Sequence, residues 1–323
     1  MHIKIIVLLL INTCFLKAQF SGAVGSIGTT AMYKDSSAFI NWASVCSVTR
    51  GYQDIANTPA GYANVGIDTN GTQKAGVNPV VSLGDGGIAI LTFPNPIING
   101  VGFDFAVFEN SFNDVFLELA FVEVSSDGIN YFRFPSTSNT QSLTQIGPFD
   151  NVGDATKLNN LAGKYRGMYG TPFDLQELQS QIGVNINNIT HVKIIDVVGC
   201  VNAPYATYDQ SNKAINDPYP TAFGSGGFDL DAVGVIHQLT VSIEEYSYLE
   251  KSIQVYPNPS SDIVFIYSNK INIKQLLLKD VNGKIVLESR MNEIHLNTLE
   301  NGFYILNIIN SEGITFIKKI IKQ

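Results

Sequence analysis

The stretch LELAFVEVSSDGINYFRF, residues 117–134, decides the fold class because it has the form of two β-strands joined by a tight turn. Branched and aromatic residues, which favour pleated sheets, occupy both halves of the stretch. Between the halves, Asp127-Gly128 is a pair that suits the backbone conformation of a short hairpin turn. The stretch therefore predicts an antiparallel hairpin.

Further runs of the same kind recur along the chain and are separated by clusters of turn residues. They are GGIAILTF (86–93), VGFDFAVFEN (101–110), ITHVKIIDVVG (189–199) and GFDLDAVGVI (227–236). Many short strands joined by irregular loops are typical of a β-sandwich. The fold class predicted for residues 19–241 is therefore all-β, with a jelly-roll β-sandwich as the body.

One helix is expected within this body, over GTPFDLQELQSQIG at 170–183. Thr171 can act as its N-cap, Pro172 fits the first helical position, and Gly183 can end it. Asp174, near the start, then has a structural role at the helix N-terminus and needs no catalytic one.

The charge distribution limits the classes of partner. Of the 323 residues 15% are charged, and residues 19–251 hold 22 Asp and Glu against 10 Lys and Arg, a net charge of −12. Affinity for nucleic acid comes from Lys and Arg that neutralise phosphates, so an acidic body argues against a nucleic-acid partner. The same acidity is compatible with cation binding, and equally with simple solubility.

The first 18 residues have the organisation of a secretory signal peptide. Lys4 precedes an apolar run from Ile5 to Ile11, and the small residue Ala18 suits a cleavage site. The run is too short to span a bilayer. We therefore expect residues 1–18 to be removed and the protein to be exported.

After the leader two cysteines remain, Cys46 and Cys200. An even number of cysteines in an exported chain allows a disulfide, and Cys46–Cys200 is the predicted bridge. Two buried free thiols are the alternative. The histidines His191, His237 and His295 are scattered, so no zinc-ligand spacing is present.

The character of the sequence changes near residue 242. Residues 242–252, SIEEYSYLEKS, are polar and lack strand alternation, and are interpreted as a linker. The segment 253–323 then contains short strand-like runs with Asn-Gly turns at 282–283 and 301–302. A small seven-stranded, immunoglobulin-like β-sandwich is predicted for this segment.

The C-terminal segment resembles the C-terminal sorting domain of the type IX secretion system. The resemblance rests on Tyr-Pro-Asn-Pro at 256–259, Asn-Gly-Lys at 282–284, Gly-Phe-Tyr at 302–304 and Lys-Lys at 318–319. It implies a partner, the type IX secretion machinery of a Bacteroidetes-type bacterium. It also implies removal of the domain after export, with the protein secreted or placed on the outer-membrane cell surface.

The body resembles the galactose-binding-like jelly-roll "cell surface protein" family of Bacteroidetes. SLGDGG, DFAVFEN, VEVSSDG, GTPFDL and GFDLDAV carry this resemblance in that order, over roughly residues 80–235. It implies a fold, and by analogy a structural calcium ion, but no defined activity.

Signatures of common enzymes are missing. The sequence has no G-x-S-x-G elbow and no H-E-x-x-H, and GDGGIA at 84–89 leads into a strand where a dinucleotide loop would lead into a helix. Asp229 and Asp231 are close enough in sequence to be a carboxylate pair, but they project from one strand, whereas glycosidases place their two acids across a sugar bond. We therefore expect a protein that is not an enzyme.

Carboxylates and amides near strand ends suggest a possible cofactor, calcium, which prefers carboxylate and carbonyl oxygens. FAVFENSFND supplies Glu109, Asn110 and Asp114, and Glu118 follows at the next strand. The candidate metal ligands are Glu109, Asn110, Glu118, Asp229 and Asp231, provided that the strands carrying them are neighbours. The alternative is that these groups cap turns and accept backbone N–H groups.

A ligand-binding surface is predicted in the long loop 201–224, whose candidate residues are Tyr205, Tyr208, Tyr219 and Phe223. Aromatic rings stack on sugars and amides bind their hydroxyl groups. Trp42 is compatible with either a binding platform or a core position. The leading hypothesis is a secreted or surface binding protein for a carbohydrate or a similar polyhydroxylated ligand. The alternatives are an accessory protein of an outer-membrane nutrient transporter, for example for corrinoids, and a carbohydrate-active enzyme.

Overall fold

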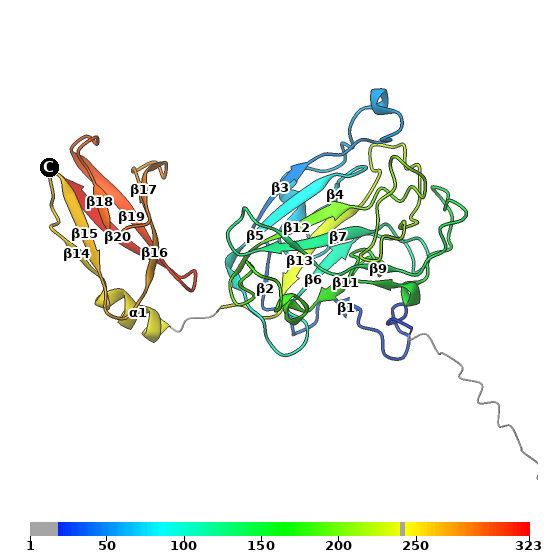
Figure 1. The fold of residues 1–323 in the computed structure, drawn as a ribbon, viewed down its shortest axis with the longest axis horizontal. Helices are drawn as coiled ribbons and strands as arrows, with labels where there is room; N and C mark the ends of the chain where they lie inside the picture. Colours follow the sequence, from blue (N-terminus) through cyan, green and yellow to red (C-terminus); the bar gives the residue numbers. More distant parts are fainter. Residues whose placement is uncertain (1–18, 240–242) are drawn as a thin grey trace, which may run out of the picture.

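The computed structural model describes residues 19–239 and 243–323. Figure 1 shows an N-terminal body of β-strands and long loops, and a smaller C-terminal group of strands, here called the tail. Both parts are built from antiparallel strands, so the predicted all-β class is confirmed. Within the described ranges, no helix is long and apolar enough to cross a membrane.

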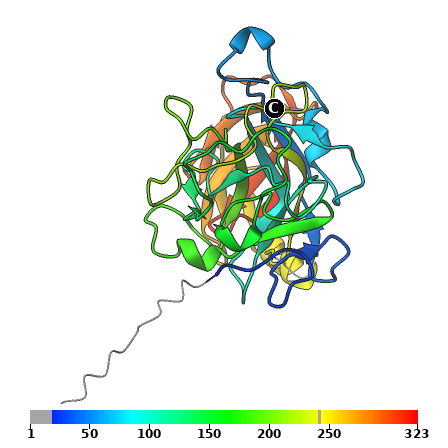
Figure 2. The same ribbon diagram turned by 90° about the vertical axis from the view of Figure 1, so that its right-hand side faces the viewer.

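The body consists of two main sheets, which Figure 2 shows from the end that carries the loops. The first sheet has the order β1-β11-β6-β13-β2, and β4 also pairs with β13. Its strands are β1 (Met32–Tyr33), β2 (Asn41–Trp42), β4 (Val81–Ser82), β6 (Phe105–Glu109), β11 (Tyr169–Phe173) and β13 (Asp229–Val235).

The second sheet has the order β3-β5-β12-β7-β8. Its strands are β3 (Val45–Thr49), β5 (Ile88–Ile97), β7 (Ala120–Ser125), β8 (Phe132–Arg133) and β12 (Ile189–Asp196). A short pair, β9 (Thr137–Ser138) with β10 (Leu158–Asn159), lies outside both sheets. Single 3-10 turns complete the body: η1 (Thr58–Ala60), η2 (Asp68–Gly71), η3 (Ala155–Lys157) and η4 (Leu175–Leu178).

The main core lies between the two sheets. Alternate residues of β6, such as Phe105 and Val107, pack in one cluster with Leu91 of β5, Val122 of β7 and Val192 of β12. A strand has a side-chain period of two, so each strand presents every second residue to this layer. Burying an apolar side chain of this size contributes about 1.5–3 kcal/mol, and this layer is the main source of the body's stability.

The hairpin predicted at 117–134 is present as β7 and β8, which pair antiparallel. At the turn, the Asp127 carboxylate accepts hydrogen bonds from the backbone N–H groups of Asn130 (2.8 Å) and Ile129 (2.9 Å). These donors hold the pKa of Asp127 well below its usual range. Gly128 adopts φ +74°, a conformation that favours glycine.

The helix predicted at 170–183 is wrong. Residues 169–173 form β11, which pairs with β6, and a single 3-10 turn, η4, follows. Asp174, and not Thr171, caps that turn by accepting the N–H of Gln176 at 2.9 Å. The tertiary pairing of 171–173 with β6 therefore outweighs the local helix-start signal.

Trp42 occupies a small core on the outer face of the first sheet. Its ring centroid lies 5.0 Å from that of Phe39 and 5.3 Å from that of Phe108. Ala106 and Ala232 are buried in the same cluster. The structure therefore favours the core alternative for Trp42 over a binding platform.

The tail is a small sandwich of seven strands within residues 253–323 of the described chain. One sheet has the order β14-β15-β18 and the other β17-β16-β19-β20, around a core of aliphatic side chains and Phe316. The strands are β14 (Gln254–Tyr256), β15 (Ile263–Tyr267), β16 (Ile273–Lys279), β17 (Ile285–Ser289), β18 (Glu293–His295), β19 (Gly302–Asn310) and β20 (Thr315–Lys322).

The Tyr-Pro-Asn-Pro motif fastens the entry of the tail to its last strand. The Asn258 side chain donates to the carbonyl oxygen of Lys319 at 2.7 Å and accepts the N–H of Ile321 at 2.9 Å. The backbone N–H of Ser260 donates to the Ile321 carbonyl at 2.9 Å. The spacing between the motif and the chain's final residues is therefore a requirement of the sandwich itself.

The segment interpreted as a linker is helical over α1 (Ile243–Ser252). Tyr246 and Leu249 lie three residues apart, and both pack on the tail core. The Tyr246 ring stacks on Phe316 with centroids 5.0 Å apart. Residues 246–252 thus pack as part of the tail. The polar composition of the segment did not predict this packing.

Candidate ligand-binding site

A pocket of about 510 Å³ lies at the start of β13, where the segment leading into β7 meets two loops of the body. Its walls are formed by four phenylalanines and Pro148, and its polar side chains are two carboxylates, two amides and the hydroxyl of Ser225. We call it the aromatic pocket; it is defined by Phe112, Asn113, Phe116, Glu118, Phe149, Asn151, Phe223 and Asp229.

The rings of the aromatic pocket come from three segments and form two pairs. Phe112 and Phe116 have centroids 6.1 Å apart, and Phe149 and Phe223 have centroids 5.6 Å apart. Phe112 is 85% exposed and Phe149 is 71% exposed. Clustered exposed rings are uncommon on soluble proteins and typically mark a surface that binds something.

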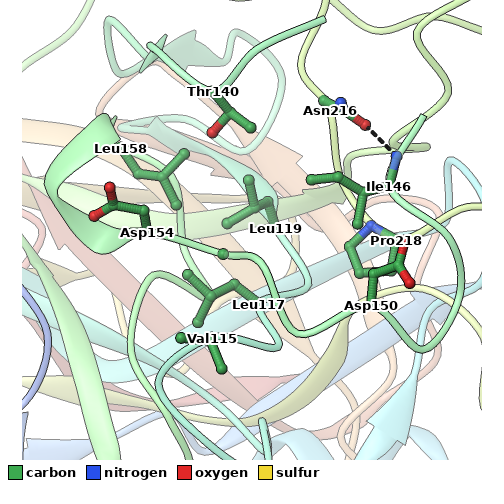
Figure 3. Close-up of a pocket in the computed structure, with 11 residues that line it drawn as sticks. Val115, Leu117, Leu119, Thr140, Ile146, Asp150, Asp154, Leu158, Asn216 and Pro218 are labelled. Atoms are coloured by element: carbon green, nitrogen blue, oxygen red, sulfur yellow. Dashed lines mark hydrogen bonds between the residues drawn. The ribbon is translucent and has the colours of Figure 1, made fainter. Parts of the chain in front are cut away.

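Side chains of residues 115–119 alternate in direction, and this alternation determines which of them line the aromatic pocket. Val115, Leu117 and Leu119 point away from it into a separate apolar pit, where they meet Leu158 and Ile146 (Figure 3). This pit has a volume of about 10 Å³, so it is packing and not a ligand site. The intervening residues Phe116 and Glu118 face the aromatic pocket instead.

A close backbone contact holds this segment in place. Gly163 has φ +81°, and a Cβ atom there would lie 1.7 Å from the carbonyl oxygen of Glu118. Only glycine fits such an approach. The backbone N–H groups of Ala120 and Ala162 each donate to the other residue's carbonyl, at 3.1 and 2.9 Å. Glu118 is thus positioned by a rigid backbone.

The two amides join the loops that carry the rings. Asn113 donates from its side chain to the side-chain oxygen of Asn151 at 2.8 Å. The Asn113 oxygen accepts the backbone N–H groups of Val115 (2.9 Å) and Phe116 (2.7 Å). These bonds set the separation between Phe112 and Phe149 on the opposite walls.

The two carboxylates of the aromatic pocket differ in their partners. Asp229 accepts a hydrogen bond from the Ser82 hydroxyl, whereas the Glu118 carboxylate has no hydrogen-bond donor among the described residues. Burial raises the pKa of Asp229 to about 6, and the Ser82 bond and the charge of Arg50 oppose that rise. Burial, and then the charges of Asp229 and Asp196, raise the pKa of Glu118 well above its usual value.

More carboxylates lie buried behind the pocket and accept backbone N–H groups. Glu109 accepts that of Ser111 at 2.7 Å, Asp196 those of Gly86 (2.9 Å) and Phe228 (2.7 Å), and Asp217 that of Leu119 (2.6 Å). Burial raises the pKa of all three acids well above the usual range, and neighbouring acids add to the effect. Each therefore has a structural role as a loop anchor.

The predicted calcium ligands do not form one site. The strands carrying them are neighbours as expected, with Leu230 of β13 opposite Glu109 of β6. A β-bulge follows, because Ala232 is opposite Phe108, so Asp231 is the extra residue on β13. Asp231 accepts the N–H of Gly76 at 3.0 Å, whereas Asp229 accepts the Ser82 hydroxyl, so the two aspartates have different partners.

The other predicted ligands are also separated. Asn110 is exposed, and Glu109 is buried with the Ser111 N–H as its donor at 2.7 Å. Of the five predicted ligands, Glu118 and Asp229 line the aromatic pocket together. In residues 19–239 and 243–323 no group of three or more His, Cys, Asp or Glu side chains is placed to hold a metal ion. Glu118 and Asp229 thus share the pocket, and calcium binding itself stays a prediction.

Of the four predicted aromatic ligand residues, Phe223 lines the aromatic pocket. Tyr208 lies in an isolated bridge with Ala214, away from that lining. Burial, and then the charge of Asp54, raises the pKa of Tyr219, which lies close to Cys200, Asp85 and Tyr205. The sequence analysis did not predict Phe112, Phe116 and Phe149 as ligand-binding residues. They could have been noticed as aromatic residues clustered in loops that are rich in Asn and Asp.

The predicted Cys46–Cys200 bridge is wrong, since both residues are buried free thiols. Cys46 packs in the main core beside Leu91 and Val81, and burial raises its pKa to about 12. The Cys200 thiol donates to the carbonyl oxygen of Asn202 at 3.4 Å. The two thiols are thus accommodated separately.

Comparison with protein families identifies the tail. Residues 254–323 match the family of the secretion system C-terminal sorting domain. The sorting domain indicates export to the cell surface or secretion, with the type IX secretion machinery as a partner. The match leaves the body outside it, so the likeness of the body to a jelly-roll family stays a prediction.

Comparisons with whole proteins add little. A search of curated protein sequences gave no match. Among solved structures, the chain is similar to the β-glucuronidase from Ruminococcus gnavus in complex with C6-substituted uronic isofagomine, at 12% identity and a TM-score of 0.19, covering 89% of this chain and 47% of that one. The same enzyme in complex with D-glucaro-d-lactam gives 12% identity, a TM-score of 0.19, and 86% and 46% coverage. The chain thus spans about half the length of these enzymes.

Proposed function

We propose that this is a secreted or surface-displayed binding protein whose body takes a carbohydrate, or a similar polyhydroxylated molecule, in the aromatic pocket. The observation that carries the proposal is the convergence of four phenyl rings, two amides and two carboxylates in one pocket of about 510 Å³. Phenyl rings pack against the C–H faces of a sugar ring. The carboxylate oxygens accept hydrogen bonds from its hydroxyl groups, and the two amides hold the loops that carry the rings.

The exposure of the rings supports a surface ligand over a fully enclosed one. With Phe112 at 85% and Phe149 at 71% exposed, the walls project into solvent. A partner of a nutrient transporter would need to enclose its cargo in a deep apolar pocket. An open pocket with both aromatic and polar walls suits a sugar unit of a longer glycan better. The tail directs the body to the cell surface or the medium, where glycans are available.

Binding is tested by titrating the purified protein with a panel of neutral and charged oligosaccharides in a calorimeter. Replacing both rings of one wall, Phe149→Ala with Phe223→Ala, should weaken binding by at least tenfold, since stacked aromatic contacts contribute about 1–2 kcal/mol in desolvated sites. Phe303→Ala, on the tail, is the matched control because Phe303 is 54% exposed and outside the pocket. Equal binding by the double variant and the control would refute this pocket as the binding site.

A second candidate function, glycoside hydrolysis, is favoured by one specific observation. Glu118 and Asp229 come from different segments, line one pocket, and have unequal hydrogen-bond partners. Glycosidases use two acids whose environments differ, one to donate a proton and one as base or nucleophile.

The two functions are separated by assaying any glycan that binds for release of reducing ends. Glu118→Gln and Asp229→Asn are compared singly with the unaltered protein. Binding without turnover in all three supports the binding protein, whereas turnover lost in either variant with binding retained would establish the enzyme.

A further inference from the structure

We propose that the ligand of the aromatic pocket is a polyhydroxylated molecule that carries an ammonium group, such as an amino sugar, and that this group pairs with Glu118 and Asp229. This inference rests on the proposed function and specifies the chemical class of the ligand. It is argued from the charges, the free carboxylate and the rings of the pocket.

The first observation is the imbalance of charge in the lining. Two carboxylates line the aromatic pocket, and no Lys, Arg or His does so within the part of the chain that the structure describes. The charge of Arg50 lowers the pKa of Asp229, but its guanidinium group is bound to backbone carbonyls outside the pocket lining. Arg50 donates to the carbonyl oxygens of Val65 (2.8 Å) and Gly66 (2.7 Å), and Arg166 pairs with Asp114 at 2.5 Å.

The second observation is that the Glu118 carboxylate faces the pocket without a donor. The other buried acids of this region, such as Asp196 and Asp217, each accept at least one backbone N–H. Glu118 is half-buried and lines the pocket, so a ligand can supply the donors that no described protein group gives its carboxylate. An ammonium group offers three N–H donors and the compensating charge, which makes it a better partner for a carboxylate than a hydroxyl group.

The third observation is that the aromatic rings suit a cation as well as a sugar face. A cation within about 6 Å of a ring centroid is attracted to the negative face of the ring. Phe116 shares the pocket segment with Glu118, and Phe223 lies on the loop before Asp229, so each carboxylate is accompanied by a ring. A ligand amine bound by the acids therefore lies in a ring-walled space.

A metal ion is a poorer occupant of the same place. Calcium prefers six to eight oxygen ligands. The pocket offers the carboxylates of Glu118 and Asp229, while Asn113 uses its side-chain oxygen to accept two backbone N–H groups. An organic ammonium group can be bound by two carboxylates and a neighbouring aromatic ring, and the pocket contains these groups.

The experiment compares D-glucosamine with D-glucose, which differ at one position by an amine or a hydroxyl, by calorimetric titration of the purified protein at about pH 7. We expect glucosamine to bind at least tenfold more tightly than glucose, and the preference to shrink as sodium chloride is raised. Glu118→Gln should abolish the preference and leave weak, equal binding of both sugars. Glu123→Gln is the matched control, because Glu123 pairs with Arg133 (2.9 Å) and Lys193 (3.0 Å) away from the pocket.

The alternative outcomes each overturn the inference in a distinguishable way. Equal binding of the two sugars by the unaltered protein would refute the charged ligand and leave the proposed function standing. Binding of calcium chloride, abolished by Glu118→Gln, with neither sugar bound would replace the ammonium by a metal ion. Absence of binding by either sugar and by the neutral oligosaccharide panel would refute the proposed function itself. Trp42 fluorescence shows whether Glu118→Gln is folded. If that variant is unfolded, Asp229→Asn replaces it in the experiment, and the same loss of preference is expected.

Discussion

The body and the tail handle polar side chains in opposite ways. In the body, acids such as Glu109, Asp196 and Asp217 are buried and anchor loops. Among the described residues of the tail, no Asp or Glu is buried, and its buried polar residues are Ser260 and Asn310. Burying ionisable groups costs stability, so a domain retains them where they position something else. The comparison indicates that the body is constructed around its loop-rich end, whereas the tail is constructed as a compact, self-contained module.

The largest expected effect separates the two parts completely. Deleting residues 254–323 should leave the body folded, since its core contains no residue from the tail. The truncated protein should fail to reach the cell surface or the medium, because the sorting domain lies in the deleted segment. Surface labelling and fractionation of the producing cells measure delivery, and thermal unfolding of the truncated protein confirms folding. Normal delivery of the truncated protein would contradict the assignment.

The next effect is a pH dependence of stability confined to the body. Burial raises the pKa of Asp85 to about 7 and of Asp229 to about 6, and raises those of Glu109, Asp196 and Asp217 well above their usual range. The folded body therefore holds more protons than the unfolded chain between about pH 4 and pH 7. Its free energy of unfolding should therefore be highest near pH 4 and should fall as pH rises from about 4 to about 7, by about 1.4 kcal/mol per unit of pKa difference at most.

Trp42, the one tryptophan of the sequence, lies in the body, so its fluorescence reports unfolding of that part. We expect Tm measured in this way to be lower at pH 8 than at pH 5.5 by on the order of 5 °C. Asp127, Asp154 and Asp35 have lowered pKa values and act in the opposite direction, but their contribution is lost chiefly below about pH 4. A body that becomes more stable between pH 5.5 and pH 8 would show that the buried acids are ionised in the folded protein.

A smaller effect distinguishes the two aspartates of β13. Asp231→Asn should lower the free energy of unfolding of the body by about 1 kcal/mol, because it weakens the acceptor for the Gly76 N–H. It should leave ligand affinity unchanged. Asp229→Asn should weaken ligand binding, since Asp229 lines the aromatic pocket. Denaturant unfolding and calorimetric titration of both variants provide the two measurements, and equal losses of binding would contradict the separation by the β-bulge.

The smallest effect concerns the tail. Asn258→Ala removes the bonds of that side chain to Lys319 and Ile321 and should destabilise the tail by about 1–2 kcal/mol. The Trp42 fluorescence transition of the body should not move. Amide hydrogen exchange resolves the two parts, with faster exchange expected in β20 and no change in β6 or β13. A coincident change in the body strands would indicate that the two parts unfold as one unit.

Local patterns were sufficient to predict several features. Asp127-Gly128 predicted the hairpin of β7 and β8, and the observed connection is longer than the two-residue turn expected, since Val124 pairs with Phe132. The tail was recognisable from its motifs because Asn258 must reach the last strand, which constrains spacing along the chain. The calcium hypothesis required the strands of Glu109 and Asp229 to be neighbours, and the pairing of Leu230 with Glu109 meets that condition.

Other features depend on contacts between distant segments. Thr171 and Pro172 have a helix-start pattern, yet pairing with β6 makes them strand, because a ladder partner contributes more than a local cap. One extra residue at Asp231 separates two acids that simple alternation places together.

The aromatic pocket itself is assembled from segments far apart in the chain. Phe112 and Phe116 precede β7, Phe149 lies in the next long loop, and Phe223 precedes β13. Sequence alone therefore determines the fold class, the export domain and the acidity of the body, since each depends on composition or on contiguous motifs. Folding decides which acids and rings share a pocket, because loop positions follow from the sheets to which the loops are attached and from single contacts such as that of Asn113 with Asn151.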